Sequence, residues 1–512
     1  MSSDKKEFVL PAKTTLQQAE NRPSILVECG GEYILPDYMP KVQKVLRIEA
    51  QVIPPSRYMS VSEAQMSGDV LHTLIYMGED GEPGATVLPA KYEFSVPLAD
   101  SEGAPMVITD MEVDTVTYRL SAPRKLNIRT RLSAKPTVIK NLDITEQQKP
   151  ADIAALHKLY DEIDSIYTVV LNSSDITISD SVSVNVGENA HLIWCGSNAA
   201  VSDVKVSDGG VNVRGEVIVK IMLEDSGNMK IFTKKIPFDE FVDGEVSRGA
   251  MAIAMPHVIS TEAGKDNDNN IMVDVVLGIK AICDTPKRIP VLRDAYSEIG
   301  TGIIEYSKVP TEKLVIAHSG IHSVGISVPK NSTGVESIMS VIDTSGRAVL
   351  DEVASNGKLI ISGRCLLNSI CKQEDDSVTS IEYTVPFKID FEREIKNGIT
   401  PNVTVSLMNA RARVDGDSIV CDMDISVNAR AIEKGSENMV SSMDYTSLTL
   451  YKKSENPLCL IYPNGESLWA LAKKNHVSPE SLLRVNSLDI AEKDYSEPSA
   501  LAHMRSMMLE LK

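Results

Sequence analysis

Features typical of nucleic-acid binding, membrane insertion and secretion are scarce in this chain of 512 residues. Lysine and arginine number 52 against 71 aspartates and glutamates, so the formal net charge is −19. Proteins that bind nucleic acid or anionic membranes normally carry a concentrated basic face, and neither partner is expected here. No run of about 18 apolar residues occurs, so no transmembrane helix is expected. The first residues have two lysines but no apolar core of a secretory signal, which predicts a cytoplasmic protein.

Cysteine and aromatic residues are also sparse. The seven cysteines are scattered, and none stands in a CxxC pair. This spacing predicts small buried side chains in a reducing compartment and not disulfides. Aromatic residues make up only 5% of the chain, so valine, isoleucine and leucine must fill the cores, and this balance favours strands over helices. The length predicts several separate cores.

Patterns that supply catalysis or bind a cofactor do not stand out. The close pair His318 and His322 has no carboxylate between its members, and the acidic run 266–270 is followed by Ile271 where a calcium loop requires glycine. No Walker-type loop occurs, and the glycine-rich run 78–84 carries acids that would repel phosphate. We predict no catalytic residue, no metal site and no cofactor. An enzyme hidden in one β-rich unit is the least favoured interpretation.

Three markers recur along the first 450 residues. They are a β-rich run closed by an acidic turn, an apolar–proline–apolar triplet, and a long β-rich stretch that alternates apolar and polar residues most clearly in its last copy. The triplet prolines are 140 and 149 residues apart (237−97 and 386−237), so the period is nearly constant. The markers lie at 70–81, 213–227 and 361–376 for the run, at Pro97, Pro237 and Pro386 for the triplet, and at 116–131, 271–280 and 419–430 for the third stretch.

These patterns predict a mainly β protein with three repeated antiparallel domains, over residues 1–140, 171–300 and 301–445. Alternation puts one face of a strand in a core and the other in water. Short runs separated by turn residues fit either β-sandwich-like domains or open barrels. A proline removes a donor from the strand ladder, so the second marker is expected at a sheet edge, at a bulge or at the start of a strand.

Residues 141–170 are expected to connect the first two domains and to contain a helix from about Pro150 to Ile163. Pro150 suits the first turn, where its missing N–H costs nothing. The predicted helix either packs on a neighbouring sheet or is exposed for a partner. Apolar residues recur in it at helical spacing, namely Ile153, Leu156, Leu159, Tyr160 and Ile163.

Residues 456–512 change from strands to a compact mixed pattern. A strand from Leu458 is followed by a turn and two short helices. Ser467 is expected to cap the first helix, and Ser478 the second, with Pro479 at its first position. The segment 504–511 is the best candidate for a final strand, so the expected order is β-α-α-β.

This segment resembles the LysM family, whose pattern is a strand, a Gly-Asp-Thr-Leu turn, a helix with Ile-Ala, a Val-Ser connector, and Leu and Asn closing a second helix. LysM modules bind N-acetylglucosamine polymers through two loops at one end of the sheet. Here Glu-Ser replaces Asp-Thr in the turn and the usual ending is absent, which favours a protein ligand over a glycan. The likeness rests on Gly465, Glu466, Ser467, Leu468, Leu471, Ala472, Val477, Ser478, Leu482 and Asn486.

Trp469 follows the turn directly. Its side chain either stacks on a sugar, anchors a protein interface, or covers the core of a module so small that every aromatic counts. The resemblance implies a ligand- or partner-binding site made of Gly465, Glu466, Ser467, Leu468, Trp469, Leu482 and Asn486.

Near the start, the motif Glu-Tyr-Ile-Leu-Pro-Asp-Tyr-Met-Pro at 32–40 precedes a partly alternating run from Val42 to Val52. Together with the repeated units, it resembles the SPOCS-type domain of spore-envelope proteins, most strongly in the first unit and the tail. Repeated SPOCS-like units with one terminal LysM resemble the family of the clostridial SpoIVA-interacting protein L and, more loosely, that of SpoVID of Bacillus.

This resemblance implies a non-catalytic scaffold in the mother-cell cytoplasm. The scaffold would tether the SpoIVA-type coat ATPase at the forespore surface through its LysM module during spore coat assembly. The alternative is a cell-envelope protein that binds peptidoglycan, N-acetylglucosamine glycans or lipid-linked precursors.

Overall fold

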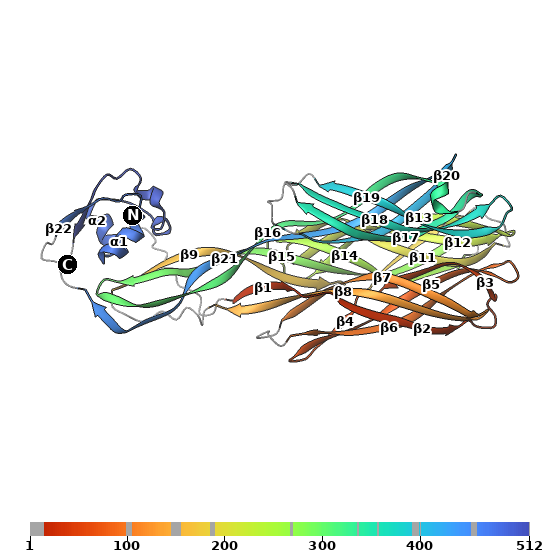
Figure 1. The fold of residues 1–512 in the computed structure, drawn as a ribbon, viewed down its shortest axis with the longest axis horizontal. Helices are drawn as coiled ribbons and strands as arrows, with labels where there is room; N and C mark the ends of the chain where they lie inside the picture. The colour runs from red at the N-terminus through yellow and green to blue at the C-terminus, as the bar shows by residue number, and fades with distance from the viewer. Residues whose placement is uncertain are drawn as a thin grey trace.

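The computed structural model describes residues 15–98, 105–144, 155–184, 190–266, 270–334, 337–355, 358–391, 399, 401–451 and 458–510. The protein is mainly β, and its paired strands run antiparallel. Figure 1 shows an elongated molecule in which a broad body of strands narrows into a stalk, and a small helical module lies at the far end of the stalk.

The first part of the body contains two sheets, each built around one long strand. β8 pairs with β1, β2 and β7, and β5 pairs with β3, β4 and β6. The strands are β1 Thr15–Asn21, β2 Ile25–Ile34, β3 Val42–Val52, β4 Ser56–Met59, β5 Glu63–Gly78, β6 Pro83–Pro97, β7 Met106–Ala122 and β8 Lys125–Asp143.

The second part also contains two sheets. β15 pairs with β9, β10 and β14, and β12 lies between β11 and β13. The strands are β9 Leu156–Asn172, β10 Ile176–Val182, β11 His191–Ser207, β12 Gly210–Asp225, β13 Asn228–Asp243, β14 Met251–Lys265 and β15 Ile271–Ser297.

The third part is one six-stranded sheet in the order β16-β21-β20-β17-β18-β19. β17 and β20 meet at a single pair, Thr344 and Ala410, so the sheet divides into two three-stranded halves there. The elements are β16 Gly300–Pro329, the 3₁₀ turn η2 Lys330–Thr333, β17 Ile338–Ser355, β18 Leu359–Gln373, β19 Val378–Phe391, β20 Asn402–Asp415 and β21 Ser418–Leu450.

The same order of strand pairing occurs in each part of the body. One strand joins a hairpin (β3 with β5–β6, β11 with β12–β13, β17 with β18–β19), and a second hairpin follows (β7–β8, β14–β15, β20–β21). Pro97, Pro237 and Pro386 lie in β6, β13 and β19, which each have one pairing partner. Three positions were expected for these prolines: a sheet edge, a bulge or the start of a strand. Among the described strands they stand at edges, where N–H groups need no ladder acceptor.

The helix predicted from Pro150 to Ile163 is wrong where the chain is described. Residues 145–154 lie outside the described residues, and from Leu156 the chain forms β9, which pairs with Lys280–Ser297 of β15. Leu159 and Ile163 are buried in this strand. Their spacing of four residues places them on one face of a strand as well as on one face of a helix, so the pattern alone could not distinguish the two.

The stalk is made of the far ends of four long strands (Figure 1). The β9–β15 ribbon and the β16–β21 ribbon meet at the short connection between β15 and β16, at residues 298–299. Buried side chains from both ribbons form one cluster, which gives the stalk a core of its own. The cluster includes Ile163, Ile289, Val291, Val309 and Met439, with Leu16 and Ile144 at its base.

The seven cysteines are all free. Cys283, Cys365, Cys371 and Cys421 are buried, which confirms the prediction of small core side chains for these four. Burial raises the pKa of Cys365 to about 12. Such thiols stay protonated and unreactive at neutral pH.

The C-terminal module begins with a strand and ends with its partner. Ser467 Oγ accepts a hydrogen bond from the Ala470 N–H at 3.2 Å, and Ser478 Oγ accepts one from the Ser481 N–H at 3.0 Å, so both predicted helix caps are confirmed. The elements are β22 Leu458–Ile461, α1 Leu468–Asn475, α2 Pro479–Val485, the 3₁₀ turns η3 Glu492–Asp494 and η4 Pro498–Leu501, and β23 Met507–Glu510.

Candidate functional site

Most of the residues predicted for the site at the C-terminal module stabilise the module itself. Leu468 and Leu482 are 0% and 1% exposed and lie in its core. Ser467 is the cap of α1. Gly465 occupies the preceding turn with φ +82°, a left-handed conformation that favours glycine. Glu466 forms an ion pair with Lys474 at 3.1 Å.

Asn486 also has a structural role. Its side-chain amide donates to the Met508 carbonyl at 2.8 Å and accepts from the Met508 N–H at 2.6 Å. These bonds fasten the end of α2 to β23. The predicted site residues therefore do not converge on one exposed surface.

Trp469 is the exception, because it packs against both the module core and the stalk. It is only 5% exposed, and it belongs to a core cluster that contains Leu159 of β9 and Tyr296 of β15. The rings of Trp469 and Tyr296 meet edge to face with centroids 5.0 Å apart. The Tyr296 hydroxyl donates to the Val477 carbonyl at 2.6 Å. The tryptophan thus packs on the β9–β15 ribbon and anchors the module there.

Asp294 of β15 is the polar centre of this junction. Its carboxylate accepts the Trp469 indole N–H at 2.9 Å, the Lys473 ammonium at 2.7 Å and the Tyr306 hydroxyl at 2.7 Å. Burial alone would raise the pKa of Asp294, but the hydrogen bonds from Lys473, Trp469 and Tyr306 lower it below its usual range. The carboxylate is therefore held ionised as the acceptor of all three donors.

A second contact joins the module to the other ribbon. The rings of Tyr451, directly after β21, and His476, at the end of α1, stack with centroids 3.4 Å apart. The Tyr451 N–H donates to the Ile299 carbonyl at 3.0 Å, and its hydroxyl accepts from Thr301 at 2.9 Å. The module consequently contacts the tips of both ribbons.

The loops that join the two strands of the module to its helices lie at 462–467 and 486–506. The second loop reaches the start of α1, where the Trp469 N–H donates to the carbonyl of Tyr495 at 2.9 Å, and the Tyr495 side chain is buried. A hollow beside this loop is lined by Asp489, Asp494 and Glu497 among others, and its described lining includes no tryptophan, tyrosine or phenylalanine. It lacks the flat aromatic surface on which a sugar ring stacks.

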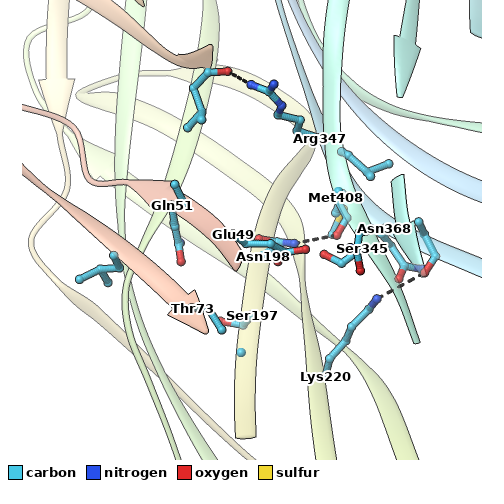
Figure 2. Close-up of a pocket in the computed structure, with 18 of the residues that line it drawn as sticks. Glu49, Gln51, Thr73, Ser197, Asn198, Lys220, Ser345, Arg347, Asn368 and Met408 are labelled. Atoms are coloured by element: carbon cyan, nitrogen blue, oxygen red, sulfur yellow. Dashed lines mark hydrogen bonds between the residues drawn. The ribbon is translucent and has the colours of Figure 1, made fainter. Parts of the chain in front are cut away.

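A second candidate site is a cavity of about 540 Å³ where the three parts of the body meet. Figure 2 shows its lining, to which β3 and β5, β11 and β12, and β17 and β18 all contribute. Its volume is in the range of ligand pockets. Its described lining contains the carboxylates of Glu49 and Glu382 and the thiol of Cys195, and no histidine or aspartate.

The polar side chains around this cavity link the parts of the body. Asn198 donates to the Met408 carbonyl at 3.2 Å, and Arg347 donates to the Val113 carbonyl (Figure 2). Lys220 donates to the carboxylate of Asp343 at 3.0 Å and to the Ala410 carbonyl at 3.3 Å. These three donors are thus already engaged by other parts of the same chain.

The strongest of these links is a buried ion triad with one member from each part of the body. Arg47 of β3, Lys220 of β12 and Asp343 of β17 are 2%, 9% and 5% exposed, and both cations bond to the aspartate. Burial alone would raise the pKa of Asp343, but the charges of Arg47 and Lys220 outweigh burial and hold it far below its usual range. The three parts therefore form one interlocked body.

Neither junction could be found from sequence patterns. Asp294 and Tyr296 lie 175 and 173 residues before Trp469 (469−294 and 469−296), and nothing in their immediate sequence marks them as its partners. The members of the triad are separated by similar distances along the chain and sit in ordinary strand patterns. Only the packing of whole strands brings these residues together.

The fold and these junctions define an elongated, mainly β protein whose two candidate sites are built from packing contacts. Residues 190–263, which cover β11 to β13 and most of β14, match the family model described as SipL, SPOCS domain. The match supports a SipL-like family and a sporulation-related role in protein interaction. It falls in the second part of the body, whereas the sequence likeness was expected to be strongest in the first part and the tail.

No curated protein and no solved structure matches the chain. Among the described residues, no helix is both long and apolar enough to cross a membrane. In the same residues, no group of three or more histidine, cysteine, aspartate or glutamate side chains is placed to hold a metal ion. His318 and His322 lie side by side in β16, with their Nε2 atoms 3.4 Å apart.

Proposed function

We propose that this chain is a non-catalytic scaffold of spore-envelope assembly, which tethers a coat ATPase of the SpoIVA type at the forespore surface. The observation that carries the proposal is the match of residues 190–263 to the SipL, SPOCS domain. In this proposal the body comprises three SPOCS-like repeats over 1–140, 171–300 and 301–445, and residues 456–512 are a LysM module.

The shape of the molecule supports a tethering role. A stalk with its own core separates the module from the interlocked body (Figure 1). A scaffold of this kind can attach one partner at the body and present the module at a fixed distance. Several copies on a polymeric partner would gain apparent affinity by multivalency without new contacts.

The chemistry of the module favours a protein partner over a glycan. Trp469 and Lys473 place an aromatic ring, an indole donor and a cation on one face of α1. Tryptophan is enriched among the residues that dominate binding at protein interfaces. The hollow beside the second loop has no large aromatic side chain in its described lining, and its carboxylates do not offer a stacking surface to a sugar.

The proposed location is the cytoplasm of the mother cell, at the forespore surface and spore coat. The free, buried cysteines and the net charge of −19 fit a reducing compartment and a soluble scaffold.

The test is direct binding of the full-length chain to a purified SpoIVA-type ATPase. Lys473→Ala leaves the module core intact and should weaken binding about tenfold, because a charge-assisted contact is lost. Trp469→Ala should weaken it further. Tyr462→Ala is the matched control, since Tyr462 is 58% exposed on the same module.

Full ATPase binding by both variants would contradict the proposed surface. A parallel titration of the full-length chain with chito-oligosaccharides distinguishes the alternative function. Saturable binding below millimolar concentration that is lost in Trp469→Ala would favour the envelope glycan or its lipid-linked precursors as the ligand.

A further inference from the structure

The stalk covers the face of α1 that the proposed function assigns to the partner. We infer that the tip of β15 competes with the partner for this face, and that the partner presents the same chemistry as the tip, a carboxylate beside an aromatic hydroxyl. The inference rests on the proposed function and adds to it the kind of surface that is recognised and the contact that controls access.

The carboxylate requirement follows from the donors on α1. The Trp469 indole N–H and the Lys473 ammonium point at one acceptor, Asp294, at 2.9 and 2.7 Å. An indole N–H can only donate and an ammonium carries three donors, so a partner that replaces the stalk must supply a negative acceptor at this position. An amide oxygen could accept the indole N–H but would not balance the charge of Lys473. A basic group would repel Lys473 and leave the indole N–H unpaired beside Trp469, which is only 5% exposed.

The aromatic requirement follows from the remainder of the contact. The rings of Tyr296 and Trp469 meet edge to face with centroids 5.0 Å apart. The Tyr296 hydroxyl donates a hydrogen bond to the Val477 carbonyl at 2.6 Å. Asp294 and Tyr296 are two residues apart in β15, so one strand delivers both groups to α1. A partner with an acid and a tyrosine spaced by one residue on an extended segment satisfies every bond that the stalk makes at this point.

The aromatic contact and the ion pair of this junction differ in how far they are exposed to water. The Trp469 and Tyr296 side chains are buried, whereas the side chains of Asp294 and Lys473 are 18% and 39% exposed. Water therefore reaches the ion pair from one side and can replace it as the module leaves the stalk. Only molecules with an undocked module can then bind the partner. The apparent affinity is therefore the intrinsic affinity multiplied by the undocked fraction.

The first measurement asks whether this contact docks the module, without any partner. The chain has two tryptophans, so Trp194→Phe leaves Trp469 as the only one. In that background, Asp294→Ala should increase quenching of Trp469 fluorescence by acrylamide. Asp161→Ala is the matched control, because this carboxylate is on the same ribbon and pairs with Arg293 of the stalk. Equal quenching in Asp294→Ala and its parent would overturn the inference.

The second measurement is the affinity of the full-length chain for the SpoIVA-type ATPase. Asp294→Ala should bind about tenfold more tightly than wild type, because docking no longer competes. Lys473→Ala should bind more weakly even though it too undocks the module, since it removes a group that the partner needs. Asp161→Ala should bind as wild type does.

The outcomes distinguish an error in the proposed partner-binding surface from an error in the inferred competition with β15. Undocking and loss of a contact group have opposite effects on affinity, so the surface is tested in the undocked background. If adding Lys473→Ala or Trp469→Ala to Asp294→Ala leaves binding unchanged, the proposed surface is wrong. If those two variants lose binding while Asp294→Ala exposes Trp469 without gaining affinity, the surface stands and the competition is refuted. If Asp294→Ala gains affinity, a double variant with Lys473→Ala should lose that gain.

Discussion

The junction inside the body and the junction between module and stalk use the same kinds of groups in different surroundings. In the body, Asp343 bonds to two cations, and all three members are at least nine-tenths buried. At the stalk, Asp294 bonds to a cation that is 39% exposed and to an indole. A buried charge cannot exchange its partner for water, whereas a half-exposed charge can.

This difference implies that one junction is permanent and the other can open. Separating the parts of the body would leave buried charged groups without their partners. Separating the module exposes one aromatic cluster and returns an ion pair to water. The comparison can be tested by breaking each junction in turn.

The largest effect is expected from Asp343→Ala. Removing the shared carboxylate leaves the buried Lys220 without a charged partner and Arg47 with only its longer pair to Glu49 at 3.6 Å. Loss of one partner from a buried ion pair costs about 3–5 kcal/mol of stability. The variant should show a lower denaturant midpoint for the body. Asp239→Ala is the control, since its pair with Arg214 has side chains that are 55% and 58% exposed. Similar denaturant midpoints for both variants would show that the triad contributes no more to the stability of the body than an exposed ion pair does.

A smaller and local effect is expected from Trp469→Ala. Truncating a buried tryptophan costs about 3 kcal/mol or more, and here the cost falls on the module and its contact with the stalk. Hydrogen exchange should accelerate in α1 and α2 and stay unchanged in β5, β12 and β18. Tyr462→Ala provides the exposed control on the module. Faster exchange throughout the body would mean that module and body unfold as one unit.

The sequence predicted local structure well and long-range contacts poorly. The caps Ser467 and Ser478 and the edge prolines were predictable because each depends on a residue's own backbone chemistry. The helix expected from Pro150 failed from Leu156 onward because β15 supplies a pairing strand more than a hundred residues later. The site prediction selected residues by family pattern, and most of these residues hold the module together. The acid that meets Trp469 was missed, since no short-range signal connects β15 to α1.

The pH dependence of stability offers a third test, which concerns mainly the body. Burial lowers the pKa of His72, whose Nε2 lies 2.7 Å from the Thr130 hydroxyl, and burial also lowers the pKa of His257 and His322. A histidine with a lowered pKa in the folded state is neutral there, while the unfolded chain takes up a proton below about pH 6.5. Stability should therefore be complete above that pH and should fall as the pH is lowered toward 5.

Denaturant midpoints at pH 7.5, 6.5 and 5.5 measure this slope. His72→Gln should reduce the slope, because one group that resists protonation is removed. His503→Gln is the control on the exposed surface of the module and should leave the slope unchanged. An unchanged slope in His72→Gln would contradict the assignment of a neutral buried histidine at this position.

The smallest effect is expected from Ser467→Ala, and it sharpens the contrast between the two regions. The cap satisfies the Ala470 N–H at 3.2 Å, and loss of such a cap costs about 1 kcal/mol. In the body, a loss of this size would be a small part of the stability that the long paired strands provide. The module has only two short helices and a two-stranded sheet, so the same loss is a larger part of its stability. Hydrogen exchange in α1 should accelerate about fivefold for that cost, and Ser499→Ala, in the second loop, should not change it. An unchanged α1 would indicate that docking on the stalk, and not the cap, sets the stability of this helix.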